Sequence, residues 1–139
     1  MKSLLGKVGV ILIGLAIFGY AKAWGEDWKL YGSTENHKAY YDTQSITHPS
    51  KNIVKVYLKW DYTKKGVMNW VNDYGKEYEN ISHSIFLHEI NCVENKLRRL
   101  SATNYDHKGN VIDSISSKSK WMFFIQESRG GGLFKEVCK

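Results

Sequence analysis

The clearest hydrophobic pattern in the chain lies in residues 53–62, IVKVYLKWDY. Apolar side chains alternate there with lysines and an aspartate, and alternation over ten residues is typical of a β-strand with one buried face. The predicted core face consists of Val54, Val56, Leu58 and Trp60. Successive side chains of a strand point to opposite faces, so the other face carries Lys55, Tyr57 and Lys59.

Other strand-like runs lie on both sides of this segment. Apolar and aromatic side chains are frequent in residues 28–31 and 38–42. The turn-forming segment GSTENH lies between these two runs and predicts a hairpin. Loop residues follow at 47–52, before the long strand. The remaining predicted strands are residues 83–92, 97–105, 111–115 and 121–125.

Two segments have helical rather than strand spacing. Between Lys64 and Tyr78 the apolar residues recur every three or four positions, which predicts a short amphipathic helix that Gly75 ends. Residues 133–138 are long enough for one to two helical turns, behind a predicted flexible joint at residues 129–132. The expected fold class is therefore α+β: an antiparallel sheet of about six strands, with a C-terminal helix tethered to one face by a disulfide.

The N-terminal residues form a different kind of segment. Lys2 and Lys7 precede an apolar core at residues 8–20, and Ala21-Lys22-Ala23 follows as a small-x-small site. This order is typical of a secretory signal peptide, and the core is shorter than the roughly 20 residues that span a bilayer. We expect a signal peptide at residues 1–23 and one exported domain at residues 24–139, with no stable membrane anchor after cleavage; the alternative is an uncleaved N-terminal anchor.

If the protein is exported, its two cysteines are expected to form a structural disulfide. Oxidising compartments favour disulfides, and an internal bond could join only Cys92 to Cys138. A redox pair or an intermolecular bridge are the alternatives, but the C-x-x-C spacing of redox pairs is absent. We favour an intramolecular structural bond that holds the C-terminal helix on the sheet.

Charge and motifs narrow the classes of function. The formal net charge is +6, but three lysines and no acid lie before Trp24, so the expected mature domain has a net charge of only +3. The basic residues are scattered, which argues against a nucleic-acid interface. The histidines lack zinc-site spacing, and there is no G-x-S-x-G or phosphate-binding motif. We therefore expect no enzyme activity, no metal and no cofactor.

Four stretches resemble the Surface-adhesin protein E family. They are DWKLYGS with HKAYYD, LHEINCVENKLRRLSATNYDHKGNVIDS, the KW before the last strand, and the terminal LFKEVCK. The resemblance covers the whole expected mature chain. It implies an antiparallel sheet with a disulfide-bonded C-terminal helix on its concave side. It also implies binding to extracellular-matrix and plasma proteins and a capacity to form homodimers. Unlike the namesake lipoprotein, this chain has no cysteine near the cleavage site.

These observations favour an exported binding domain whose partner is an extracellular or envelope protein. The alternative is a periplasmic structural or envelope-maintenance protein with no specific ligand. Aromatic side chains and arginine are enriched in protein interfaces. The candidate binding residues are Lys55, Tyr57, Lys59, Arg98 and Arg99. Because the two arginines are adjacent in a predicted strand, at most one of them can belong to a given patch.

Overall fold

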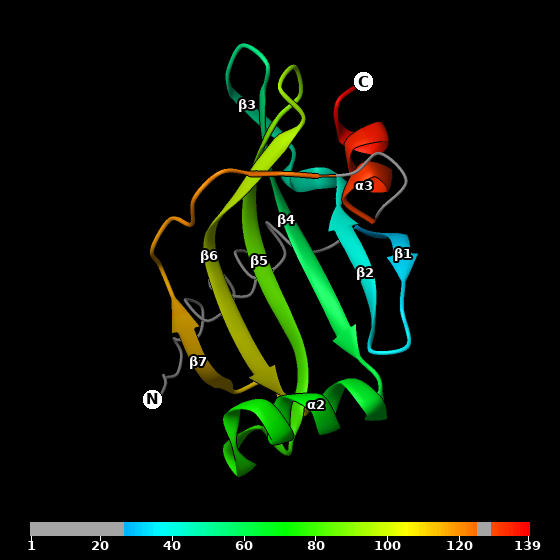
Figure 1. Cartoon of the computed structure of the whole chain (residues 1–139), viewed down its shortest axis with the longest axis vertical. Helices are drawn as coiled ribbons and strands as arrows, with labels where there is room; N and C mark the ends of the chain where they lie inside the picture. The colour runs from blue at the N-terminus through cyan, green and yellow to red at the C-terminus, as the bar shows by residue number, and fades with distance from the viewer. Residues whose placement is uncertain (1–26, 125–128) are drawn as a thin grey trace, which may run out of the picture.

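The structure of the protein is a computed structural model that describes residues 27–124 and 129–139. The expected signal peptide, at residues 1–23, lies outside the described residues, and so does Ile125 at the end of the last predicted strand. The described part forms one antiparallel sheet with a helix on one face and a second helix across one end (Figure 1).

The sheet contains eight strands within the described residues. The main path runs in the order β1-β2-β4-β5-β6-β7, while β3 pairs with β4 and β8 pairs with β6. Their bounds are β1 Trp28–Ser33, β2 His37–Asp42, β3 Thr47–Ser50, β4 Ile53–Tyr62, β5 Ile81–Asn91, β6 Lys96–Asp106, β7 Val111–Ile115 and β8 Met122–Phe123. The prediction of about six antiparallel strands therefore describes the main path.

Two strands differ from the sequence prediction, since β3 was not expected and β8 is shorter than expected within the described residues. Residues 47–50 were expected to be a loop, but β3 pairs with β4 through Thr47 opposite Lys55 and Ser50 opposite Ile53. All four residues of β3 are exposed. Pro49 is compatible with such a strand because it lies at the edge of a sheet, where a missing N–H donor is tolerated. The strand expected at 121–125 forms only the two-residue β8 in the described part of the chain.

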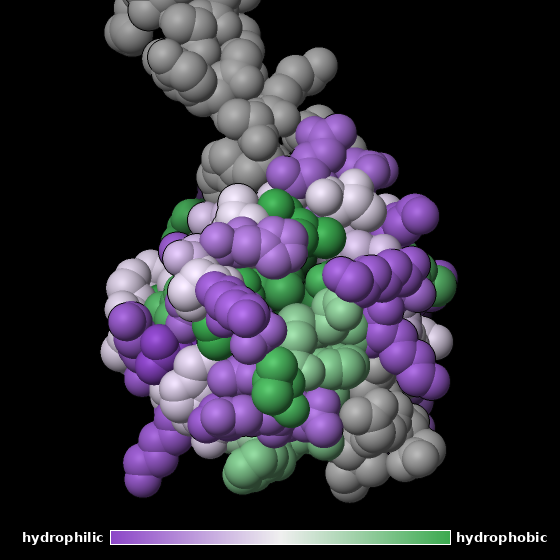
Figure 2. Space-filling model, turned by 90° about the horizontal axis from the view of Figure 1, so that it is seen from above, coloured by the Kyte–Doolittle hydropathy of each residue, from purple (hydrophilic) through white to green (hydrophobic). Residues whose placement is uncertain are grey.

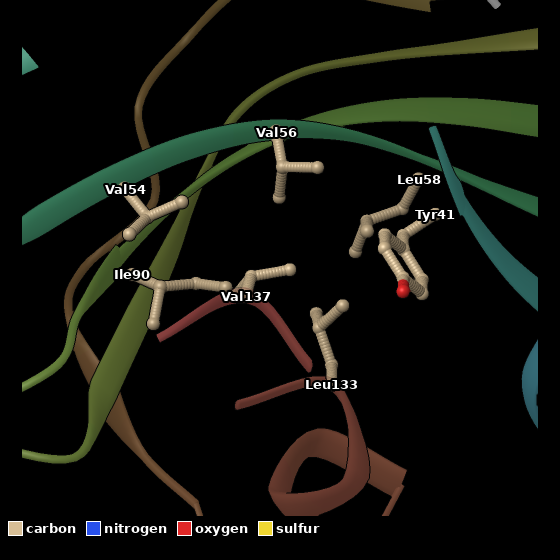
Figure 3. Packing of buried hydrophobic residues seen from close by; sticks show 7 residues of the cluster. All are labelled: Tyr41, Val54, Val56, Leu58, Ile90, Leu133 and Val137. Atoms are coloured by element: carbon tan, nitrogen blue, oxygen red, sulfur yellow. The ribbon is translucent and has the colours of Figure 1, made fainter. Parts of the chain in front are cut away.

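The core lies on the predicted face of β4. Val54, Val56 and Leu58 are at most 2% exposed. They pack with residues of neighbouring strands and of the C-terminal helix α3 (Arg129–Val137) around one cluster (Figure 3). The other members of this cluster are Tyr41, Ile90, Leu133 and Val137. Trp60 lies on the same face but is only half-buried, beyond the region that this cluster covers.

Helix α3 is fixed to the sheet by a covalent bond and by packing. Cys92 and Cys138 form the predicted intramolecular disulfide, with their Cα atoms 5.7 Å apart. The phenol of Tyr41 donates a hydrogen bond to Glu136 Oε1 at 3.1 Å. The prediction of a flexible joint at residues 129–132 was wrong, because α3 begins at Arg129 and includes the glycines. Docking and the disulfide stabilise a helix that would be too short and too glycine-rich alone.

Helix α2 (Lys64–Tyr74) crosses the end of the sheet away from α3 (Figure 1). Thr63 caps its N-terminus, since its hydroxyl accepts a hydrogen bond from Gly66 N at 3.2 Å. Gly75 follows the last turn at φ +118°, as predicted. Gly66 faces the β1–β2 turn so closely that a Cβ would lie 2.1 Å from Asn36 O.

The opposite end of the molecule carries β3 and the C-terminus. Seen from above, it is mostly hydrophilic, with hydrophobic residues visible between the polar ones (Figure 2). No helix in the described part of the chain is both long enough and apolar enough to cross a membrane.

Candidate binding face of the sheet

The face of the sheet opposite α3 carries most of the candidate binding residues. Lys55, Tyr57 and Lys59 alternate with the buried residues of β4 and are all half-exposed. On this face Lys55 lies opposite Glu89 of β5, and Arg98 of β6 lies opposite the same glutamate. We call these residues, Lys55, Tyr57, Lys59 and Arg98, the aromatic–basic face.

Lys59 is held between two aromatic rings. Its Nζ lies 4.9 Å from the ring centroid of Trp28 and 5.2 Å from that of Tyr40. Tyr40 is its direct cross-strand partner in β2, and Trp28 comes from the edge strand β1. The two rings keep the ammonium in place by cation–π attraction and leave it at the surface.

Arg98 has a similar environment at the other side of the sheet. Its Nε donates to Glu89 Oε1 at 2.9 Å, and its Nη2 lies 2.8 Å from the same oxygen. Its guanidinium carbon lies 4.5 Å from the ring centroid of Trp121, which precedes β8. Lys96 Nζ lies 5.4 Å from the same ring. Because Glu89 is only 15% exposed, the ion pair holds the guanidinium in one position more firmly than a fully exposed pair would.

Arg99 does not belong to the aromatic–basic face. It pairs with His88 of β5, next to a β-bulge at Leu87/His88, and lines a pocket on the α3 side. The structure therefore brings four of the five candidate residues to one face and places the fifth on the other.

His83 lies further along the aromatic–basic side of β5, opposite Asp61 of β4. Its ring stacks on Tyr105 with the centroids 5.0 Å apart. Burial lowers the pKa of His83, against the opposing effect of Asp61. The ring therefore favours its neutral form, which suits stacking on an aromatic side chain.

The sequence pattern does not identify the partners that orient the candidate residues. These partners are Trp28, Tyr40, Glu89 and Trp121. Tyr40 and Glu89 could have been found once β2, β4, β5 and β6 were placed in register, since residues directly opposite share a face. The positions of Trp28 and Trp121 depend on a bulge in β1 and on the pairing of β8 with β6, which the pattern of residues does not indicate.

The described residues contain no cluster of three or more histidine, cysteine or acidic side chains that could hold a metal ion. The arrangement of the aromatic–basic face is instead suited to contact. It offers aromatic rings and an arginine, which are enriched in protein interfaces, and lysines that can attract acidic groups of a partner.

The fold and this face define a small antiparallel α+β domain with a disulfide-bonded C-terminal helix. The sequence profile of the Surface-adhesin protein E family matches residues 28–139, and the chain belongs to this family.

A solved structure supports the same fold. Protein E of Haemophilus influenzae superposes with a TM-score of 0.54 at 16% sequence identity, over 82% of this chain and 85% of that chain. At that identity the likeness concerns the fold alone. No curated protein is significantly similar in sequence.

Proposed function

We propose that the chain is an exported, non-enzymatic adhesin-like domain that binds an extracellular or envelope protein through the aromatic–basic face. Membership of the Surface-adhesin protein E family supports a binding role and export. The observation that carries the proposal is the position of Lys59 between Trp28 and Tyr40. A cation held in this way loses little conformational entropy on binding, so such a surface is prepared for a partner.

The charge of the face indicates the kind of partner. Lys55, Lys59 and Arg98 provide three positive charges, and Glu89 neutralises one of them. The partner surface should therefore present acidic groups around an apolar or aromatic centre that packs on Tyr57. Electrostatic attraction of this kind raises the rate of association and weakens with added salt.

A binding assay with charge-reversed variants tests this proposal. The oxidised protein is measured by biolayer interferometry against a panel of purified extracellular-matrix and envelope proteins. We expect saturable binding to at least one of them and a loss of 10-fold or more in affinity in Lys55→Glu/Lys59→Glu. The matched control, Lys108→Glu/Lys118→Glu, makes the same change of charge at exposed positions on other segments. Absence of any saturable partner would favour a structural role in the periplasm. Equal loss in both variants would mean that general electrostatic attraction, and not the aromatic–basic face, binds the partner.

The export route has its own test. We propose cleavage after Ala23 and a mature domain at residues 24–139, on the basis of the sequence order of the N-terminal segment. N-terminal sequencing of the native protein should begin at Trp24. Protease treatment of whole cells should remove the protein if it is displayed on the surface and spare it if it is periplasmic.

A further inference from the structure

The α3 side of the sheet contains a pocket that the proposed function does not use. Its volume is about 310 Å³, and it lies between α3 and β8. Most of its lining is apolar: Leu58, Trp60, Phe86, Leu97, Met122 and Leu133. The pocket is at the small end of the range found for ligand sites, and walls of this kind suit an apolar group.

The aromatic part of the wall is organised by ring contacts. Trp60 and Phe86 meet edge to face, with ring centroids 5.0 Å apart. The Trp60 ring also stacks on His37, with the ring centroids 4.0 Å apart. Phe86 is in turn parallel to His88, with the centroids 5.9 Å apart. These contacts fix the rings in place, so the apolar surface is formed before any ligand arrives.

Two polar groups in the lining have unused hydrogen-bonding capacity. Arg99 Nε and His88 Nδ1 are buried, and neither has a hydrogen-bond partner among the described residues. The backbone of Arg99 is held on both sides by Ser119: Arg99 N donates to Ser119 Oγ at 2.9 Å, and Ser119 N donates to Arg99 O at 2.8 Å. A buried guanidinium donor without a partner is costly, which indicates that something else satisfies it.

The electrostatics of the pocket favour one negative charge. None of the lining residues that the structure describes is acidic, and Arg99 is the one arginine or lysine among them. His88 is uncharged at neutral pH, because burial and the neighbouring Arg99 lower its pKa to about 4. Arg99 thus supplies a single positive charge, and its planar donors match the two oxygens of a carboxylate.

We propose that this pocket binds a small amphipathic carboxylate, with its apolar body against Trp60 and Phe86 and its carboxylate on Arg99. An aliphatic acid of about eight carbons would place its hydrocarbon chain against the apolar walls. Its carboxylate would supply the negative charge that pairs with Arg99. The site lies on the opposite face from the aromatic–basic face, so it functions independently of the protein partner proposed above.

Titration of the oxidised full chain with octanoate tests the site. Calorimetry should give saturable 1:1 binding, and ¹⁵N NMR should show a shift of the Trp60 indole N–H. Octan-1-ol, which has the same chain without the charge, should bind at least 10-fold more weakly. No saturable octanoate binding, or equal affinity for the alcohol, would overturn the proposal even without a variant.

The adjacent arginines provide a matched pair of variants. Arg99→Gln should lower octanoate affinity by 10-fold or more, whereas Arg98→Gln removes the same charge one residue away on the other face and should leave it unchanged. Arg99→Lys keeps the charge without the planar donors and should give an intermediate affinity. An equal loss in Arg98→Gln and Arg99→Gln would mean that general attraction, and not the pocket, binds octanoate. Unchanged binding in Arg99→Gln would likewise reject the site.

Discussion

At the scale of single residues, the burial of His88 makes the stability of the fold depend on pH. Burial and the nearby Arg99 lower its pKa to about 4, against 6.5 for an ordinary histidine. The unfolded chain therefore takes up a proton at a higher pH than the folded chain. This contribution to stability is complete above pH 6.5 and is lost as the pH falls towards 4.

The loss of this contribution to stability at low pH can be measured. Between pH 7 and pH 4.5 the free energy of unfolding should fall by about 2 to 3 kcal/mol through His88 alone. In His88→Phe, which cannot be protonated, the fall over the same interval should be smaller by about that amount. Urea unfolding at the two pH values measures both. His48→Gln, at an exposed position in β3, is the control and should behave as the wild type does; an identical pH dependence in His88→Phe would contradict the assignment.

Gly66 is the second informative residue, because its hydrogen occupies the place of a side chain. A Cβ at this position would lie 2.1 Å from Asn36 O, a backbone atom. We expect Gly66→Ala to destabilise the protein by on the order of 2 kcal/mol, since α2 or the β1–β2 turn must move. Thermal unfolding checks this. A melting temperature at or above that of the wild type would show that α2 does not pack against the turn as described.

At the scale of elements, α3 depends on its attachments. The disulfide closes a separation of 46 residues, for which chain entropy predicts a contribution on the order of 4 kcal/mol. Cys138→Ser should lower the melting temperature by on the order of 10 °C and increase hydrogen exchange in α3, while the central strands keep their protection. Cys92→Ser should give the same result. If reduction of the wild type left the melting temperature unchanged, the disulfide would not stabilise α3.

The glycines of α3 give a separate test of its extent. Gly132 lies inside the helix, and a Cβ there would be 3.4 Å from Tyr31 O, an ordinary contact. Alanine favours a helix over glycine by roughly 0.5 to 1 kcal/mol, so Gly132→Ala should raise stability by up to that amount. It serves as the matched control for Gly66→Ala. A clear destabilisation by Gly132→Ala would instead support a joint at this position.

The strands and helices differ in how far the sequence predicts them. The alternation in β4 identified Val54, Val56 and Leu58 as core residues, because one buried face leaves a period of two. Gly75 ended α2 as expected, since its positive φ excludes most side chains. Residues 47–50 are typical of a loop, but they form β3 because they pair with β4 at the edge of the sheet. The three glycines of α3 are helical because the helix packs on the sheet. Both effects depend on tertiary contacts, which a local sequence pattern does not indicate.

The candidate site was predicted less completely than the core. Lys55, Tyr57 and Lys59 were placed on one face by simple alternation, and that face is the one opposite α3. The rings around Lys59 come from two other strands, so finding them requires the sheet order and register. The pocket beside Arg99 depends on how much of the sheet α3 covers, which periodicity alone cannot give.

At the scale of the whole molecule, we propose different roles for the two faces of the sheet. One face holds the hydrophobic core, α3 and the pocket beside Arg99. The other presents Tyr57 between fixed cations, and we assign partner binding to it. In the oxidising compartment that we propose for the protein, the Cys92–Cys138 disulfide would keep α3 attached to the sheet.

Site-specific photo-cross-linking in living cells tests whether the aromatic–basic face binds a protein partner. A benzoylphenylalanine replaces Tyr57 on the aromatic–basic face or, as the matched control, Tyr74, which is 66% exposed on α2. Binding through the aromatic–basic face predicts a discrete adduct with one protein from position 57, which is lost in Lys55→Glu/Lys59→Glu, and no such adduct from position 74. No adduct from position 57, or the same adducts from both positions, would contradict it.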